Sequence, residues 1–332
     1  MQDEFELIQS LLSERVDVEG SHTIEVDAGD DAAVFLPSPS LSIVTACDTM
    51  VENVHFTKET MRPFDIGWKL LASNLSDLAA MGGVGKYILL SIAIPPTWSE
   101  TEMIGIYAGI NDLARKEQVR LIGGDTVSTS GELILTLTIL GEIPPGKALL
   151  RSSAMPGDLV FVTGHLGDAA AGLHILLSQS ETYQAAFPVL VEAHKRPRAQ
   201  LQIGEWLLHS GYRPACDDVS DGLAREAYEI AEASHVKLVI QPEWIPISTA
   251  CQTYASRIQY NPIEWALNGG EDYQLLGTIS PAGWKELQQK AIACGWKVTQ
   301  IGYVEPGTGT VEMEVSGKRR ELQTKGYNHF AK

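Results

Sequence analysis

The chain contains stretches in which apolar residues recur every three or four positions, and others in which they alternate or run together. The first spacing is typical of amphipathic helices and the second of strands. The clearest helix begins at Pro63, a residue that suits a first helical turn, and its apolar stripe continues to Leu78. Both halves mix the two element types, so the predicted fold class is α/β or α+β. Further helices are predicted at about 3–13, 99–116, 167–177, 197–209, 220–235 and 284–294. Strands are predicted at 32–36, 41–46, 86–94, 119–122, 132–140, 158–163, 237–240, 273–279 and 298–304.

One cluster of helix- and strand-breaking residues divides the chain. Pro144-Pro145-Gly146 is the best candidate for a linker, and 332 residues are enough for two domains. We therefore predict an N-terminal domain over 1–146 and a C-terminal domain over 147–332. The N-terminus lacks the features of a signal peptide, and the longest apolar run, around 87–94, is too short to span a bilayer. No membrane partner is expected.

The charge balance narrows the function classes. The formal net charge is −17, which argues against a surface for nucleic acid or anionic lipid, because both require clustered Lys and Arg. An acidic protein can still bind phosphates when metal ions invert the local sign of charge. The 4 cysteines form no Cys-x-x-Cys pair, so a zinc or redox motif is not expected, and isolated thiols suit a reducing cytoplasm.

Aspartate recurs in short Gly-, Ser- or Thr-bearing segments beside predicted strands and helices. A single aspartate in such a place is more commonly a helix cap or turn residue than a metal ligand. The doubled Asp30-Asp31 and the group Asp217, Asp218 and Asp221 exceed what turn chemistry needs. Mg²⁺ is usually held by one or two carboxylates plus substrate phosphates. The pattern therefore predicts a site with several metal ions for a polyphosphate nucleotide.

Gly141–Lys147 has the glycine and lysine spacing of a phosphate-binding loop, but we reject that interpretation. Ala148 stands where the Mg²⁺-binding Ser or Thr should be, and two prolines remove backbone donors from the loop. A linker explains the segment better. The chain also lacks the glycine pattern of a dinucleotide fold after any predicted strand, and it lacks a G-x-S-x-G nucleophile motif.

Three single residues remain open between a structural and a functional interpretation. His55 is either incidental or a donor to a substrate phosphate. Arg151 is either a solvated side chain or a bidentate partner for a nucleotide phosphate. Tyr327 lies in a C-terminal segment that either frays, as chain ends commonly do, or docks onto the protein.

Taken together and in order, the motifs resemble those of the thiamine-monophosphate kinase family. The motifs that carry the likeness are Gly29–Ala33, Asp48–Phe56, Asn74–Gly82, Gly123–Thr126, Asp218–Leu223, Gly269–Tyr273 and Gly326–Phe330. The resemblance implies a two-domain fold of the aminoimidazole ribonucleotide synthetase type. In that fold the N-terminal domains form a barrel across a homodimer, and the C-terminal domain is an α/β sandwich. It also implies ATP-dependent phosphorylation of thiamine phosphate to thiamine diphosphate, with several Mg²⁺ ions.

The resemblance also assigns roles to individual residues. Metal-binding positions are Asp30, Cys47, Asp48, Thr49, Asp77, Asp125, Asp218 and Asp221. ATP-binding positions are Tyr107, Gly124, Asp125, Arg151 and Ser220, and substrate-binding positions are His55, Glu271 and Tyr327. Two departures from the family pattern are Ala46-Cys47, where the family has two hydroxyl residues, and Asn328, where it has Asp. At the first departure a backbone carbonyl can replace a side-chain ligand.

In phosphoryl transfer the protein mainly positions the reacting groups and neutralises their charge, and no general base is expected here. Two alternatives stay open. The first is another ATP-dependent enzyme of the same superfamily, of the aminoimidazole ribonucleotide synthetase or selenophosphate synthetase type. The second is a non-catalytic protein that binds divalent ions or nucleotides.

Overall fold

A computed structural model describes residues 24–26 and 32–323. The chain divides into two compact units, and each is described here by itself. The first contains the described residues up to Leu78 together with Gly83–Gly146. The second contains Ala79–Gly82 and the described residues from Lys147 onward.

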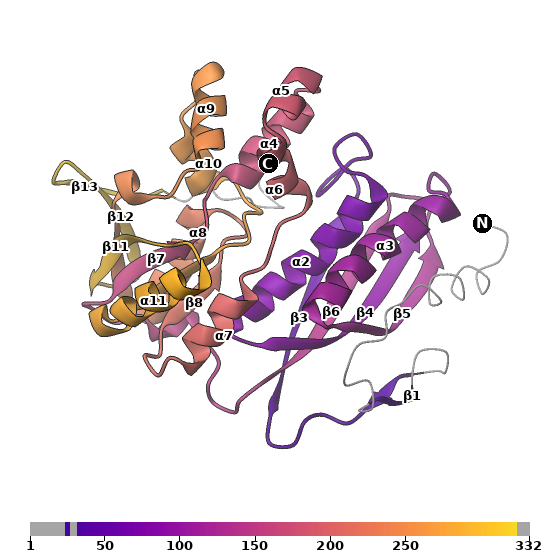
Figure 1. The fold of residues 1–332 in the computed structure, drawn as a ribbon, viewed down its shortest axis with the longest axis horizontal. Helices are drawn as coiled ribbons and strands as arrows, with labels where there is room; N and C mark the ends of the chain where they lie inside the picture. The colour runs from indigo at the N-terminus through magenta and orange to yellow at the C-terminus, as the bar shows by residue number, and fades with distance from the viewer. Residues whose placement is uncertain (1–23, 27–31, 324–332) are drawn as a thin grey trace. The chain divides into compact units, whose positions relative to one another are not determined.

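The first unit is a four-stranded sheet with two helices on one face (Figure 1). The strand order is β3-β6-β4-β5, and only the β4–β5 pair is parallel. The strands are β3 (Ser42–Val51), β4 (Val84–Ile94), β5 (Arg120–Ser128) and β6 (Ile134–Ile143), and the helices are α2 (Pro63–Met81) and α3 (Glu100–Glu117). A separate two-stranded ribbon pairs β1 (Ile24–Val26) with β2 (Val34–Phe35). Within the described residues these strands do not close into a barrel.

Close packing of α2 on α3 depends on two glycines. A Cβ atom added to Gly67 would lie 1.9 Å from the carbonyl oxygen of Ile106, and one added to Gly109 would lie 1.9 Å from that of Phe64. Any side chain at either position would therefore force the helices apart. α3 begins with a capping box in which Ser99 and Glu102 satisfy each other's backbone N–H groups. The two helices thus form a fixed support for the sheet.

The second unit is a seven-stranded sheet in the order β13-β12-β9-β11-β7-β10-β8. Its neighbours are antiparallel except for the parallel β12–β9 pair. The strands are β7 (Leu159–Thr163), β8 (Ala215–Asp218), β9 (Val236–Ile240), β10 (Leu275–Ile279), β11 (Val298–Pro306), β12 (Thr310–Val315) and β13 (Lys318–Glu321). The helices are α4 (Asp168–Leu177), α5 (Glu181–Ala186), α6 (Pro188–Lys195), α7 (Leu201–His209), α8 (Leu223–Ser234), α9 (Thr249–Arg257), α10 (Pro262–Asn268) and α11 (Pro281–Cys294). Short 3-10 turns lie at Arg151–Ser153 (η2) and Pro242–Trp244 (η3).

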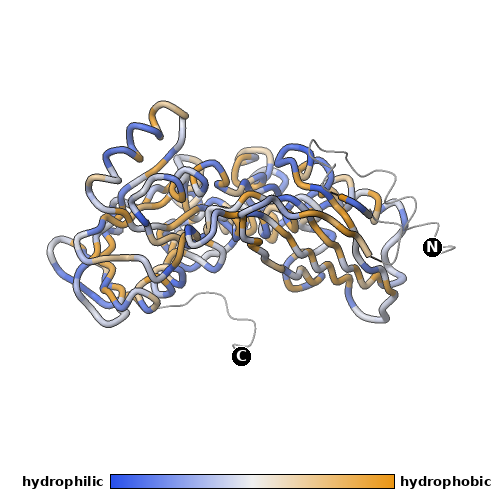
Figure 2. The backbone as a smooth tube through the Cα atoms, turned by 90° about the horizontal axis from the view of Figure 1, so that it is seen from below, coloured by the Kyte–Doolittle hydropathy of each residue, from blue (hydrophilic) through white to orange (hydrophobic). Residues whose placement is uncertain are grey.

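Both faces of this sheet are covered, because successive side chains on a strand point to opposite sides. Val160 and Val162 pack in one apolar core with residues of α8, whereas Phe161 packs in another with residues of α7 and α11. A third core holds the helices α4, α6, α9 and α10 together around Tyr254 and Trp265. Hydrophobic and hydrophilic stretches accordingly alternate along the backbone (Figure 2).

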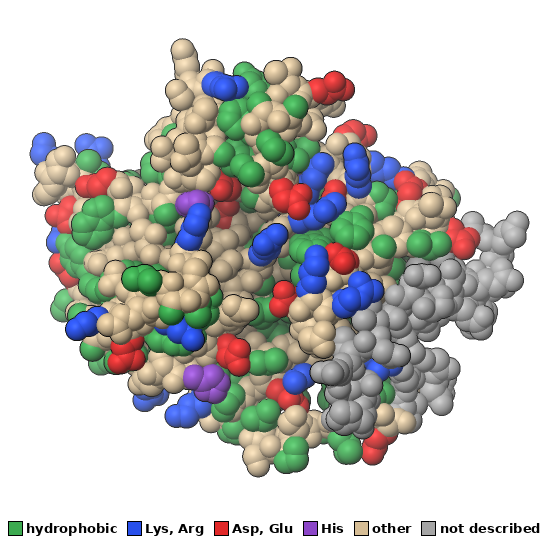
Figure 3. Space-filling view, in the orientation of Figure 1, with side chains coloured by type: hydrophobic (Ala, Val, Ile, Leu, Met, Phe, Trp, Pro, Cys, Tyr) green, Lys and Arg blue, Asp and Glu red, His purple; other side chains and the backbone are tan. Residues whose placement is uncertain are grey.

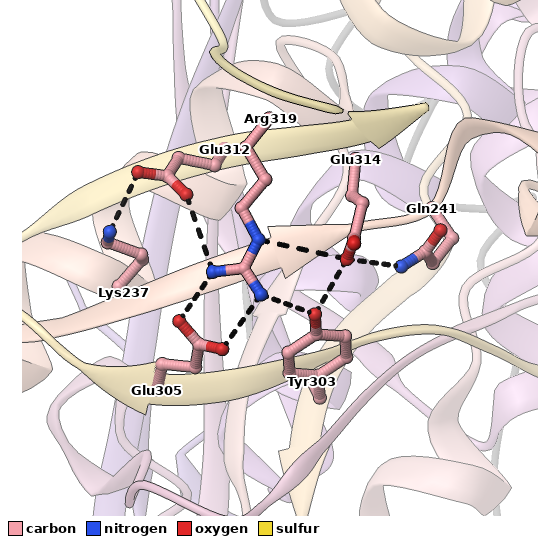
Figure 4. Close-up of polar contacts among 7 residues, drawn as sticks. All are labelled: Lys237, Gln241, Tyr303, Glu305, Glu312, Glu314 and Arg319. Carbon is pink, nitrogen blue, oxygen red and sulfur yellow. Dashed lines mark hydrogen bonds and ion pairs between the residues drawn. The ribbon is translucent and has the colours of Figure 1, made fainter. Parts of the chain in front are cut away.

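The outer edge of the sheet is held by charged side chains. Arg319 of β13 bonds Glu305 with two nitrogens, at 2.8 and 3.0 Å, and also bonds the hydroxyl of Tyr303 (Figure 4). Glu312 and Glu314 lie 3.8 Å from the same guanidinium. Lys237 of β9 bonds Glu312 over 2.7 Å, so one ionic network joins side chains of β9, β11, β12 and β13.

Most predicted elements are confirmed, but several boundaries differ. α8 begins at Leu223 and α11 at Pro281, not at Ser220 and Trp284. β3 continues beyond the predicted end at Ala46, through Asp48, to Val51. β5 continues through Gly123, Gly124 and Asp125, so that motif lies inside a strand rather than in a turn. α7 begins at Leu201, later than the Pro197 start that we expected. The expected helix at 3–13 lies outside the described residues. In the part of the chain that the structure describes, no helix is both long and apolar enough to cross a membrane.

Candidate active site

In the first unit, the side chain of Asp48 lies near two other polar side chains, those of Ser73 and His55. Burial raises the pKa of its carboxyl, while a hydrogen bond from Ser73 of α2 and the nearby His55 lower it. α2 also carries Asn74, which is buried, and Asp77, which is half-buried. Of these α2 residues, Ser73 contacts the strand that carries Asp48.

His55 is oriented by a tight turn that follows β3. The N–H of Val51 donates to Nδ1 of His55 over 3.0 Å, and the N–H of His55 donates to the Val51 carbonyl over 2.9 Å. Asn53 adopts a left-handed conformation (φ 64°) that closes the turn. An imidazole nitrogen that accepts a hydrogen bond carries no proton, so the proton of His55 resides on Nε2. His55 is therefore set up as an Nε2–H donor.

Strand alternation separates the predicted metal positions onto two faces of the sheet. Asp48 is aligned across the sheet with Leu137, Leu90 and Gly124, and this row faces the helices. Thr49 is aligned with Thr136, Ser91 and Asp125, and this row faces away from them.

The same register limits what these residues can share. Asp48 and Asp125 lie on opposite faces, with two strands between them. Three interstrand steps of about 4.8 Å separate their strands, whereas Mg²⁺ needs ligands at about 2.0–2.1 Å. The carboxylates of Asp48 and Asp125 in one chain therefore cannot bind the same Mg²⁺ ion. The exposed side chains of Cys47 and Thr49 likewise lie on the face opposite to Asp48, so any ligation beside Asp48 would come from their backbone carbonyls.

Tyr107 and Gly124 have evident structural roles. Tyr107 is buried in α3, and burial raises its pKa well above the ordinary value, so its hydroxyl stays protonated. A Cβ atom at Gly124 would lie 1.9 Å from the carbonyl oxygen of Leu90. Glycine is therefore required there for the β4–β5 pairing.

In the second unit, Arg151 is paired with an aspartate. Its Nε lies 2.7 Å from Oδ2 of Asp217, which is buried at the end of β8, and its NH1 lies 3.8 Å from Glu229. Burial raises the pKa of Asp217 to about 6, although Arg151 lowers it. One member of the aspartate group is therefore engaged in holding Arg151, a role that the sequence alone did not indicate.

Two motifs about fifty residues apart in sequence are joined by backbone hydrogen bonds. The N–H of Glu271 donates to the carbonyl of Ser220 over 2.7 Å, and that of Tyr273 donates to Val219 over 2.9 Å. A Cβ atom on Gly270 would lie 2.3 Å from the Ser220 oxygen, so only glycine allows this approach. Glu271 and Tyr273 have positive φ angles of 68° and 49°. Such conformations are uncommon outside glycine and often occur at ligand sites.

Three further residues support these motifs, and the sequence assigned an individual role to none of them. Asp272 accepts from the N–H groups of Gly167 (2.6 Å) and Ala169 (3.1 Å) at the start of α4, and it is a structural cap. Nδ1 of the buried His194 lies 3.3 Å from the Glu271 carboxylate. Glu226 accepts from the Ser220–Asp221 turn, and burial together with Asp217 raises its pKa to about 9.

The donor chemistry fits a hard divalent cation, because Asp48, Asp77, Asp125, Asp218 and Asp221 all offer carboxylate oxygens. Within residues 24–26 and 32–323, no three Asp, Glu, His or Cys side chains converge as they would around an ion. Asp30 and Tyr327 lie outside the described residues. On the face seen in Figure 3, basic and acidic side chains are interspersed.

The chain matches one family model and is similar to named proteins over nearly its whole length. Residues 29–143 match the family described as "AIR synthase related protein, N-terminal domain". The chain is 42% identical to the thiamine-monophosphate kinase of Bacillus subtilis (strain 168), over 99% of both chains. A crystal structure of the thiamine-monophosphate kinase of Stenotrophomonas maltophilia K279a has a TM-score of 0.81, at 34% identity, covering 94% of this chain and 95% of that one. A structure described as "AaThiL complexed with AMPPCP and TMP" has a TM-score of 0.79, at 32% identity, covering 98% and 96%.

Proposed function

This chain belongs to the thiamine-monophosphate kinase family, and we propose that it transfers the γ-phosphate of ATP to thiamine phosphate, yielding thiamine diphosphate and ADP. The observation that carries the proposal is the backbone hydrogen bond from Glu271 to Ser220, which joins the Ser220–Asp221 turn to the Glu271 segment. The segments that this bond joins contain residues for which we propose nucleotide, metal and substrate contacts: Ser220, Asp221 and Glu271. A relative described as bound to both AMPPCP and TMP supports the same pair of substrates.

The chemistry follows from the state of the acceptor. A phosphate ester loses its second proton near pKa ~6, so at neutral pH the acceptor is already an anion and needs no general base. The barrier is repulsion between this anion and the triphosphate. The protein's contribution is to align the two phosphates and to supply positive charge and donors. Arg151, held by Asp217, and the Nε2–H of His55 are suited to these tasks.

Asp48, Asp77, Asp125, Asp218 and Asp221 would hold Mg²⁺, together with Asp30 outside the described residues. Bound Mg²⁺ supplies charge neutralisation for the transferred phosphoryl group. The register of the first unit supports more than one ion, since Asp48 and Asp125 lie on opposite faces of the sheet. ATP would contact Gly124, Tyr107, Arg151 and Ser220, and thiamine phosphate would contact His55, Glu271 and Tyr327.

We also propose that the protein is a cytoplasmic homodimer. The helix-free face of the first sheet carries the exposed apolar residues Ile43, Val84, Leu89 and Val127. Such a face is an interaction surface, and its edges are exposed to further strand pairing. A second copy packed on this face would complete a barrel. Isolated cysteines fit a reducing compartment.

The decisive experiment measures ATP consumption and thiamine diphosphate formation by the purified protein with and without thiamine phosphate. The proposal predicts stoichiometric ADP and thiamine diphosphate only when thiamine phosphate is present. ATP hydrolysis at a rate that does not depend on thiamine phosphate would favour another enzyme of the superfamily. Nucleotide binding without turnover under any of these conditions would favour a non-catalytic protein.

A further inference from the structure

Glu226 is an acidic residue on the apolar side of α8. Its neighbours at helical spacing, Leu223, Ala227 and Ile230, are fully buried, and Glu226 itself is 3% exposed. A carboxyl group in such a position opposes folding unless it makes good hydrogen bonds. A residue selected for stability alone would be apolar here. The role of Glu226 must therefore lie in the contacts that its carboxyl group makes.

One oxygen of Glu226 bonds the turn that precedes the helix. The N–H of Asp221 donates to Oε1 over 3.0 Å, and the hydroxyl of Ser220 lies 3.4 Å from the same atom. An ordinary cap would satisfy N–H groups of the helix's first turn. Glu226 instead reaches back past the N-cap residue Gly222. Its contacts thus hold the turn and leave the end of the helix without a side-chain cap.

The turn is also fixed from its other side. The Ser220 carbonyl accepts from Glu271 over 2.7 Å, and Gly222 has a φ of 100° and lies against the backbone of Leu267. Glu226 and Glu271 therefore anchor the turn from opposite directions. The peptide group that joins Ser220 to Asp221 is bonded through both its C=O and its N–H, so the pair has little freedom to move.

We propose that Glu226 is a positioning residue that sets the Asp221 carboxylate and the Ser220 hydroxyl for the metal-bound nucleotide. This inference rests on the proposed function, because that function assigns the metal and nucleotide to Asp221 and Ser220. Outer residues of this kind orient metal ligands, and their loss commonly weakens metal affinity by about 10- to 100-fold.

The test compares variants that keep or remove the acceptor. Glu226→Gln keeps an oxygen at the same reach, Glu226→Asp withdraws the carboxylate by one methylene, and Glu226→Met removes the acceptor while filling the space. Glu232→Met, at an exposed position of the same helix, is the matched control. Binding of Mn²⁺ in the presence of AMPPCP is titrated by electron paramagnetic resonance, and folding is checked by thermal unfolding.

We expect Glu226→Gln and Glu232→Met to bind Mn²⁺ within about twofold of the unmodified protein, and Glu226→Met and Glu226→Asp to bind at least about tenfold more weakly. The KM for ATP should rise together with the dissociation constant for Mn²⁺, while the KM for thiamine phosphate stays unchanged. If Glu226→Met fails to fold, the Gln and Asp variants decide the matter. A folded Met or Asp variant with unchanged Mn²⁺ affinity overturns the proposal, as does a Gln variant as weak as Asp. An unmodified protein that binds Mn²⁺ and AMPPCP but makes no thiamine diphosphate refutes the proposed function only.

Discussion

The N–H of Val51 donates to Nδ1 of His55 over 3.0 Å, and this contact determines which ring nitrogen of the histidine carries the proton. The remaining nitrogen, Nε2, is a donor suited to a phosphate oxygen. Hydrogen bonds to charged groups contribute about 1.5–3 kcal/mol, so His55→Ala should raise the KM for thiamine phosphate by roughly 10- to 100-fold. The KM for ATP should stay within about twofold. Steady-state kinetics with each substrate varied in turn measures both constants.

His209→Ala, which removes an exposed histidine from α7, provides the control and should change neither constant. If His55→Ala raises the KM for ATP as much as that for thiamine phosphate, the turn supports the whole site and the specific donor role is wrong.

The pairing of Arg151 with Asp217 gives a second prediction. Asp217→Asn removes the charge that holds the guanidinium, so the KM for ATP should rise about tenfold. Arg151→Ala should have an effect of similar size, and the double variant should be no worse than Arg151→Ala alone, because the residues act as a unit. Glu229→Gln, which changes the more distant carboxylate, should have a smaller effect. Additive losses in the double variant would show that Asp217 acts independently of Arg151.

Asp272 makes the stability of the protein depend on pH. Burial raises its pKa to about 8, even though two N–H groups donate to the carboxylate, whereas in the unfolded chain the value is about 3.9. The folded protein therefore holds a proton that the unfolded chain has lost. The unfolding free energy should fall as pH rises between about 4 and 8, by at most about 1.4 kcal/mol per pH unit from this group.

Asp272→Asn cannot titrate and should lack this contribution. Urea unfolding of both proteins from about pH 5 to about pH 9 isolates it, because other groups cancel in the difference. The stability of the unmodified protein relative to the variant should decrease steadily with pH. A pH-independent difference would show that Asp272 stays ionised in the folded protein.

The cysteines can report on the proposed dimer. Cys47 and Cys294 are both exposed in the single chain, whereas Cys216 and Cys251 are buried with raised pKa values, to about 12 for Cys251. Only the thiolate reacts with alkylating reagents, so the buried pair should react slowest. If the open face of the first sheet is covered by a second copy, Cys47 should react much more slowly than Cys294. Mass spectrometry of partially alkylated protein gives all four rates.

Leu89→Arg supplies the control for this experiment. Leu89 lies on the same face, two strands from Cys47, and a buried arginine there would disrupt the interface. The variant should become monomeric by light scattering and should react at Cys47 as fast as at Cys294. Equal rates at Cys47 and Cys294 in the unmodified protein would contradict the dimer.

The sequence predicted elements well where the signal is local. α2 begins at Pro63 as expected, because its apolar stripe and first-turn proline do not depend on distant residues. Asp48 and Asp125 were expected near turns, but they lie inside strands. Asp and Gly favour turns, but the hydrogen bonds of a neighbouring strand override that preference, and such pairing cannot be read from one segment.

The candidate site shows the same limit. The sequence grouped Asp217 with Asp218 and Asp221. Its pairing with Arg151 could not be predicted, because that arginine lies 66 positions earlier in the chain. Glu226 did have a readable signal, since it interrupts a stripe made by Leu223, Ala227 and Ile230. A charged residue within an apolar helical stripe is worth examining in any chain, because it must find a partner when the stripe is buried.

The strand order of the second unit has a consequence for how the protein is made. β7, β8 and β9 are synthesised first, and none of them is bonded to another. Each pairs only with β10, β11 or β12, which begin at Leu275 or later. At about 5–20 residues per second, a ribosome needs roughly 6 to 23 seconds to travel from the end of β7 to the end of β10. Throughout that time the nascent chain carries apolar strands without partners. The sheet can therefore form only after β10, β11 and β12 have been made, and until then those unpaired strands are open to aggregation.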